Sequence, residues 1–169
     1  MIDNVNKYSM REILTAIHEA GSDSLVYVGT DSKQTKTQTV FITVIILHYG
    51  AKSSEGGKGC KVFPFIIAKN RIKALKQRLM EEVYTAMGYA LELAYGVDDI
   101  PGIPAESIEV HMDINPNPRH KSSVAVKEAT AYVMGQGMIP KVKPDALAAT
   151  GTSDWIGRRP TLPTFTVEA

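Results

Sequence analysis

The chain has 169 residues, with 19 Lys and Arg against 18 Asp and Glu, and a formal net charge of +1 at pH 7. Apolar residues make up 44% and charged residues 22% of the sequence, which is typical of a globular protein with a sizeable core. The near-zero net charge excludes a general attraction to nucleic acid or anionic membranes, so any nucleic-acid site must be a local patch. We expect one domain over residues 1–169.

Cysteine content and short motifs exclude several further classes. The single cysteine, Cys60, excludes an internal disulfide and fits a reducing compartment. The longest apolar run, residues 40–47, is too short to span a bilayer, and residues 1–10 lack the apolar segment of a signal peptide. We therefore expect a cytoplasmic protein. The sequence also lacks the G-x-x-x-x-G-K-[ST], H-E-x-x-H and G-x-S-x-G motifs.

The first half of the chain predicts one helix followed by three strands. Ser9 and Glu12 match a capping box, and apolar residues then recur at helical spacing up to Gly21. Strands are expected over residues 24–34, 40–47 and 60–68. Their short connections indicate an antiparallel meander. Pro64 favours an edge position for the third strand, because proline has no N–H to donate to a neighbour.

The second half predicts alternating helices and strands. The longest helix is expected from Asn70, as N-cap, to residue 95, and a Pro- and Gly-rich linker follows over 97–105. Further strands are expected over 107–114 and 139–143, and helices over 122–134 and 144–156. Residues 158–169 are expected to form an extended arm. This order predicts an α/β fold with a mixed five-stranded sheet, an antiparallel meander plus parallel strands, and helices on both faces.

Asp31 stands three residues after the apolar run 25–28, where the first predicted strand should still lie within the sheet. A carboxylate beside buried residues is costly unless it is paired, hydrogen-bonded or bound to a metal. On its position alone, a strand-ending turn is the simpler interpretation, because Asp-Ser is common in turns. A functional interpretation requires that other carboxylates reach the same place.

Two further carboxylates have informative positions. Glu82 follows Leu79 by three residues and belongs to the apolar face of its helix, whereas Glu81 is rotated away by about 100°. Asp113 lies late in the alternating strand, opposite that strand's apolar face. If this strand lies beside the first, Asp31 and Asp113 share a site. The alternatives are a Glu82 side chain that reaches water and a polar strand face that is exposed to solvent.

A fourth carboxylate is expected on the last predicted helix. Asp145 and Asp154 are nine positions apart, so they point to opposite sides of that helix and only one can join a common cluster. Asp145 follows Pro144 in the first turn, where the helix dipole favours a carboxylate in any case. The alanines after it allow this helix to lie close to the sheet. We therefore prefer Asp145 and keep Asp154 as the alternative.

Seven segments, spread over nearly the whole chain, resemble the ribonuclease H-like superfamily and in particular its YkuK-like branch. They are VYVGTDSKQ, FITVIILHY, RLMEEV, HMDINPN, KSS, YVMGQG and KPDALAAT. The segment that begins at Asp145 also resembles the final acidic motif of RuvC-type resolvases. The resemblance implies a ribonuclease H-like fold in which Asp31, Glu82, Asp113 and Asp145 hold two Mg²⁺ or Mn²⁺ ions. Asp31 would bridge both ions, Glu82 and Asp113 would hold one, and Asp145 the other.

Basic residues supply candidate contacts to a nucleic acid. Between residues 56 and 80 there are seven Lys or Arg and no Asp or Glu, which indicates either a phosphate-binding patch or the solvated face of a helix. The expected substrate contacts are Lys73, Lys76, Arg119 and Lys121, and His120 is either a proton shuttle or a surface residue.

The residues and the resemblance together leave more than one function open. The first is a metal-dependent nuclease, a hydrolase of DNA or RNA phosphodiesters that uses two metal ions. The second is a non-catalytic module that binds nucleic acid or protein on the same fold. Phosphotransfer is the third, but the sequence lacks a second glycine-rich phosphate loop.

Overall fold

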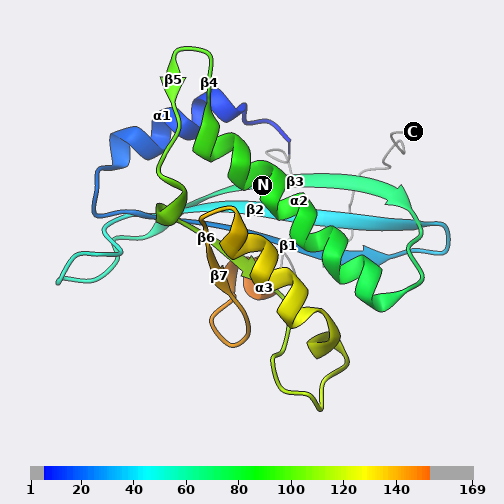
Figure 1. The fold of residues 1–169 in the computed structure, drawn as a ribbon. Coiled ribbons are helices and arrows are strands. Elements are labelled where there is room, and N and C mark those ends of the chain that lie inside the picture. Colours follow the sequence, from blue (N-terminus) through cyan, green and yellow to red (C-terminus); the bar gives the residue numbers. More distant parts are fainter. Residues whose placement is uncertain (1–5, 153–169) are drawn as a thin grey trace.

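Five strands form one mixed sheet in the computed structural model, which describes residues 6–152 (Figure 1). The strands are β1 Leu25–Gln34, β2 Gln38–His48, β3 Cys60–Asn70, β6 Ile108–Met112 and β7 Ile139–Lys141. Their order across the sheet is β3-β2-β1-β6-β7. The first three strands form the predicted antiparallel meander, and β1, β6 and β7 run parallel to one another. The predicted mixed sheet is confirmed.

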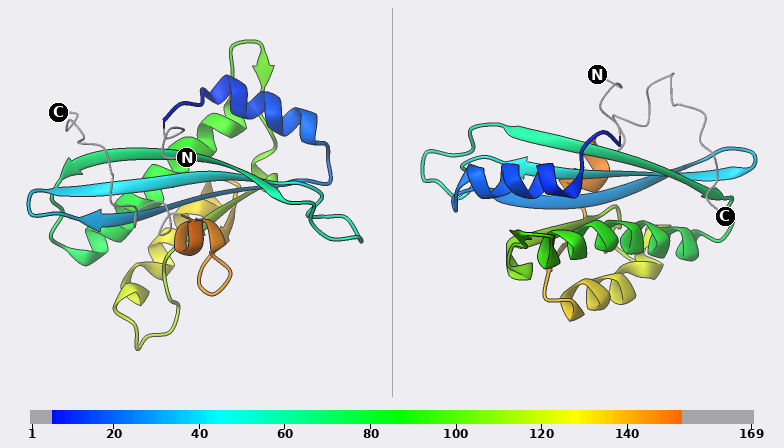
Figure 2. Two further views of the ribbon diagram at one scale, coloured as in Figure 1. Left: turned by 180° about the vertical axis from the view of Figure 1, so that it is seen from behind. Right: turned by 90° about the horizontal axis from the view of Figure 1, so that it is seen from above.

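Helices lie on both faces of this sheet. They are α1 Met10–Ala20, α2 Leu75–Tyr95 and α3 Val126–Gly135, with shorter helical turns η2 Ala105–Ser107, η3 Lys121–Ala125 and η4 Ala148–Thr152. The helices α2 and α3 cover one face, and η4 contacts the opposite face at β1 (Figure 2). The capping box of α1 is confirmed, since Ser9 and Glu12 each accept a hydrogen bond from the other's backbone N–H.

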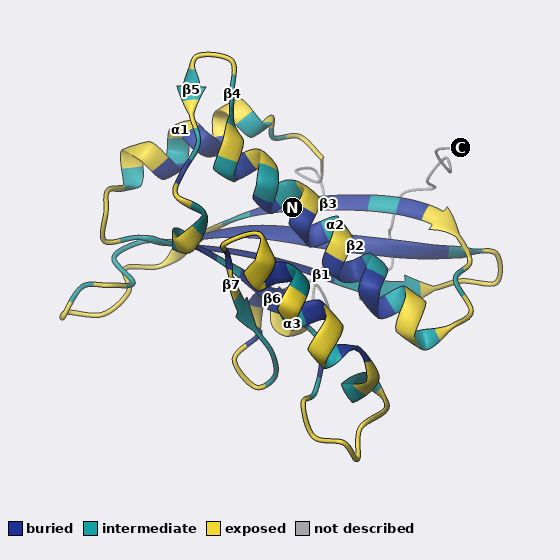
Figure 3. Ribbon diagram, viewed as in Figure 1, coloured by how far each residue is buried: buried dark blue, intermediate teal, exposed yellow. Residues whose placement is uncertain are grey.

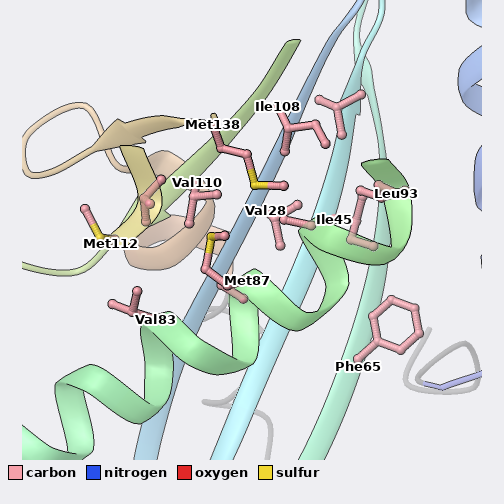
Figure 4. Packing of buried hydrophobic residues seen from close by; sticks show 14 of the residues in the cluster. Val28, Ile45, Phe65, Val83, Met87, Leu93, Ile108, Val110, Met112 and Met138 are labelled. Atoms are coloured by element: carbon pink, nitrogen blue, oxygen red, sulfur yellow. The ribbon is translucent and has the colours of Figure 1, made fainter. Parts of the chain in front are cut away.

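The main core fills the space between α2 and the sheet. Val83 and Met87 of α2 pack with Val28, Ile45 and Val110 from three strands (Figure 4). Exposed and buried residues alternate along α2, as expected for a helix with one face on a sheet (Figure 3). Burial of each such side chain stabilises the fold by about 1.5–3 kcal/mol. Within residues 6–152 we find no helix with the length and hydropathy needed to cross a bilayer.

Two predictions for the middle of the chain are wrong, and one is confirmed. Asn70 is not a helix cap, because β3 continues to this residue, where it pairs with Gln38 of β2. The predicted linker contains a short hairpin, formed by β4 Gly96–Val97 and β5 Ile100–Pro101. The proline at residue 64 does lie on an edge strand, as predicted, because β3 pairs only with β2 in the described sheet.

The last predicted helix does not begin at Pro144. The Lys143–Pro144 peptide bond is cis, and the N–H of Asp145 donates to the carbonyl of Val142 at 2.9 Å, so these residues form a turn. Helical structure follows only at η4. The rest of this predicted helix, including Asp154, and the predicted arm lie outside the described residues.

The segment η4 lies directly on the backbone of β1 at Gly29. A Cβ atom at this position would lie 2.5 Å from the backbone nitrogen of Ala149 and 2.6 Å from the carbonyl carbon of Ala148. These distances are shorter than any van der Waals contact, and both partners are backbone atoms. Gly29 therefore permits the C-terminal segment to reach the sheet, two residues before Asp31.

We expect Gly29→Ala to lower the free energy of unfolding by about 1–3 kcal/mol, because the added methyl group displaces η4 from β1. Gly88→Ala is the matched control: this exposed glycine of α2 has open space around its missing Cβ. It should raise stability by about 0.5–1 kcal/mol through helix propensity. Urea denaturation measures both values, and equal effects of the two substitutions would contradict the close contact.

Candidate active site

Two of the predicted carboxylates lie where the parallel pairing of β1 with β6 ends. In the parallel register, Gly29 lies opposite His111 and Thr30 opposite Met112, which is the last residue of β6. Asp31 follows Thr30 inside β1, and Asp113 is the first residue after β6. Neighbouring strands are about 4.8 Å apart. Asp31 lies inside β1, which continues to Gln34, so its interpretation as a strand-ending turn is wrong. One Asp31 carboxylate oxygen accepts the N–H of Ser32 at 2.8 Å.

Glu82 approaches the same edge from α2. Its side chain is only 6% exposed, so the alternative that it reaches water is wrong. Ser32 donates its hydroxyl to Glu82 Oε1 at 2.5 Å. Burial raises the pKa of Glu82 to about 8; the Ser32 hydrogen bond opposes this shift, and the negative charges of Asp31 and Asp113 add to it. Glu82 therefore lies within electrostatic reach of both aspartates and is protonated at neutral pH.

Lys143 is a neighbour of the site that the sequence did not indicate. Its Nζ lies 2.6 Å from Oδ1 of Asp113, and Thr150 Oγ1 lies 3.4 Å from the same oxygen. The Asp113 side chain is 24% exposed and that of Lys143 37%. The contact links the segment after β7 to the end of β6. In the sequence, the only indication that Lys143 lies near the site is its position two residues before the candidate ligand Asp145.

Asp145 occupies a different position from the other three acids. It is exposed and lies in the turn before η4, not in the first turn of a helix. Burial lowers the pKa of His111, on the face of the sheet that η4 contacts, and the charge of Asp145 opposes this shift only weakly. In the described structure Asp31, Asp113 and Glu82 therefore lie near the end of the β1–β6 pair, and Asp145 lies in the separate turn before η4.

His111 is a second residue that sequence reasoning missed. It is 3% exposed, so the interpretation of this strand face as exposed to solvent is wrong for His111. Its Nδ1 accepts the N–H of Ala148 at 3.0 Å, and Nε2 lies 3.0 Å from Oε2 of Glu109. The ring stacks on Tyr27, with centroids 4.8 Å apart. Burial lowers the pKa of His111, so the neutral ring donates from Nε2 to Glu109.

The predicted basic contacts are spread over several elements. Lys76 pairs with Glu128 of α3 at 2.7 Å, and Lys73 is exposed just before α2. Arg119 and Lys121 are exposed after β6, at the end of the sheet that carries Asp113. These last two are therefore the better placed of the four predicted contacts.

The donor chemistry of the carboxylates fits Mg²⁺, which prefers oxygen ligands. Among residues 6–152, however, no three His, Cys, Asp or Glu side chains are gathered closely enough to hold an ion. Lys143 contacts one oxygen of Asp113 and Ser32 contacts one oxygen of Glu82. Binding of a cation would therefore require Lys143 to move away from Asp113 and Glu82 to lose its proton.

The raised pKa of Glu82 predicts a pH-dependent stability. An unfolded Glu ionises near pH 4.3, whereas folded Glu82 keeps its proton up to about pH 8. Between these values unfolding releases a proton, so stability falls with rising pH by up to about 1.4 kcal/mol per pH unit. In Glu82→Gln this loss should be absent, because Gln does not ionise and can still accept from Ser32.

Urea denaturation in EDTA at several pH values tests this expectation. Glu81→Gln, which removes a half-exposed carboxyl from the adjacent position of α2, controls for the change in helix charge. Parallel pH profiles for the wild type and Glu82→Gln would contradict the buried, protonated state.

The hydrogen bond between Ala148 and His111 predicts a difference between two variants of similar size. His111→Leu removes the ring nitrogen that accepts the N–H of Ala148, and loss of a buried hydrogen bond costs about 1–3 kcal/mol. His111→Asn also loses the stacking on Tyr27 but keeps an oxygen acceptor near the position of Nδ1. Hydrogen exchange should show faster exchange of the Ala148 amide in His111→Leu than in His111→Asn; equal protection would show that His111 does not anchor η4.

A comparison with protein families identifies the family of the chain. The family model described as Ribonuclease H-like matches residues 9–158. Comparison with curated proteins and with solved structures finds no match. The matched range includes the whole five-stranded sheet, the helices packed on it and all four candidate carboxylates. The chain therefore belongs to the ribonuclease H-like family.

Proposed function

We propose that the chain is a metal-dependent nuclease that hydrolyses phosphodiester bonds of DNA or RNA. The observation that carries this proposal is that Asp31 and Asp113 directly follow Thr30 and Met112, the last residues that pair β1 with β6, and that the charges of both aspartates raise the pKa of Glu82. A buried carboxyl group with two carboxylates near enough to raise its pKa is unfavourable for stability, and groups with shifted pKa values of this kind are common at functional sites. Family membership supports the fold, whereas the activity rests on this site.

In this proposal Asp31, Glu82, Asp113 and Asp145 hold two Mg²⁺ or Mn²⁺ ions. Such ions supply a nucleophilic water and neutralise the charge that develops on the phosphate. Asp31 and Asp113 would offer carboxylate oxygens from the positions where the pairing of β1 with β6 ends. Ser32 keeps the Glu82 carboxyl oriented towards the two aspartates, and the desolvated position of Glu82 would strengthen its attraction to a cation once it ionises.

The nucleic acid would approach from the carboxyl end of the parallel strands. Arg119 and Lys121 are exposed at this end and are suited to phosphate contacts, whereas Lys73 and Lys76 would contact a more distant part of the strand beside α2. Lys76 would then exchange its ion pair with Glu128 for a phosphate. Because Arg119 and Lys121 are exposed to solvent, we expect them to contribute more to nucleic-acid binding than Lys73 and Lys76 do.

A specific observation favours a second candidate, a non-catalytic binding module on the same fold. Lys143 already neutralises Asp113, and no group of three ligands is gathered in the described residues. A protein with this site could bind nucleic acid or a protein partner through its basic residues without cleavage.

Asp31→Asn separates the two candidates. We expect it to reduce Mg²⁺- or Mn²⁺-dependent cleavage of labelled DNA or RNA at least about 100-fold, since even loss of an outer-shell partner costs 10–100-fold. Asp99→Asn is the control, because Asp99 is an exposed acid that pairs with Arg11 outside the site. Full activity of Asp31→Asn would contradict the site. If the wild type neither cleaves any polymer nor binds Mg²⁺ saturably in calorimetry, the binding module is the correct alternative.

A further inference from the structure

A groove of about 680 Å³ opens beside the candidate active site. Its lining comes from the loop after β6 and from the segment after β7, and it includes Asn115, Pro116, Lys143, Pro144, Leu147 and Thr150. Two of these residues, Lys143 and Thr150, are also the residues that contact Oδ1 of Asp113, at 2.6 and 3.4 Å. The groove therefore shares a wall with the site that contains Asp113.

The lining combines apolar surface with a single cation. Pro116, Pro144 and Leu147 supply apolar side chains, and Leu147 is 59% exposed although it is large. Asn115 and Thr150 offer an amide and a hydroxyl, and Lys143 offers a positive charge. A groove of this size with few polar groups is typical of a site for a small organic group. The ligand that fits has a flat apolar part, hydrogen-bonding edges and a negative charge nearby.

We propose that this groove binds one unpaired nucleotide of the substrate strand, next to the phosphate that is cleaved. The base would lie against Leu147 and the two prolines, with Asn115 near its edge, and its phosphate would receive the ammonium of Lys143. This inference rests on the proposed function. The adjoining loop carries Arg119 and Lys121, whose charges are complementary to the continuing strand.

The proposal specifies the state of the nucleic acid. A base inside a duplex is stacked and paired, and it enters a protein groove only after it has been extruded, which costs a few kcal/mol. An unpaired base does not carry this cost. The substrate class is therefore single-stranded nucleic acid, or a bulge or frayed end, rather than intact duplex.

Lys143 has two alternative partners in this scheme. It pairs with Asp113 in the described structure, and its partly exposed side chain also lines the groove. A phosphate in the groove would attract it away from Asp113. Occupation of the groove and release of the Asp113 carboxylate are thus linked through one side chain.

Fluorescence anisotropy of the full chain tests this in EDTA, where metal-dependent cleavage does not occur. The probes are short labelled single strands of DNA and of RNA, and the matching duplexes. We expect at least about tenfold tighter binding of one single strand than of its duplex. Leu147→Glu should lower single-strand affinity at least tenfold, and Leu147→Ser should lower it less. Met134→Glu, at a residue of α3 that is 61% exposed and outside the groove, should have little effect.

Three results would overturn the groove assignment: equal binding of single strand and duplex, equal effects of Leu147→Glu and Met134→Glu, or no binding of either nucleic acid. Leu147→Ser keeps the test valid if Leu147→Glu does not fold. Cleavage is measured separately with Mg²⁺ and Mn²⁺. Single-strand binding without cleavage would overturn the proposed nuclease activity but not the groove assignment. Cleavage of duplex that requires Asp31 and is unchanged by substitution of Leu147 would overturn the groove assignment but not the nuclease activity.

Discussion

The contact between the backbone of η4 and Gly29 is the constraint on which the arrangement of the site depends. Because glycine has no side chain, Ala148 and Ala149 lie directly on β1, and the N–H of Ala148 reaches His111 of the neighbouring strand. This double attachment holds the segment after β7 at the carboxyl end of the sheet. Lys143 and Thr150, one at each side of the attachment, thereby reach Asp113.

Repulsion among the carboxylates is moderated in three different ways. Burial keeps Glu82 protonated, with a pKa of about 8, so it adds no negative charge at neutral pH. Lys143 neutralises Asp113, and the N–H of Ser32 donates to Asp31. A bound divalent cation would replace these interactions with a stronger one. The described state is therefore that of a carboxylate site stabilised by protein groups, and this stabilisation opposes cation binding.

The sequence predicts the sheet better than it predicts the site. The continuous β-branched run of residues 40–47 and the capping box at Ser9 are local signals, and both elements form as predicted. The start of α2 is missed because pairing of β3 with β2 extends the strand to Asn70, which local propensity does not reveal. At Pro144 the chain forms a turn, in which the N–H of Asp145 donates to the carbonyl of Val142. The preference of proline for the first position of a helix therefore gives the wrong prediction there.

The residues of the site also differ in whether a local sequence pattern predicts them. The position of Glu82 on the apolar face is visible in the helical period. The alternating pattern also identifies the strands that carry Asp31 and precede Asp113. Lys143 and His111 acquire their roles only from partners that are distant in sequence, Asp113 and Ala148. No periodicity or motif predicts such contacts, because a lysine before a turn and a histidine in a strand are common in proteins that lack a site of this kind.

A crystal structure of the chain soaked with Mn²⁺ measures the central claim most directly, because anomalous scattering identifies the ion. If the carboxylates at the ends of β1 and β6 form a metal centre, an ion should lie between Asp31 and Asp113, and the Nζ of Lys143 should have left Asp113. A Lys143–Asp113 contact that persists at saturating Mn²⁺, with no anomalous peak at the carboxylates, would contradict the claim.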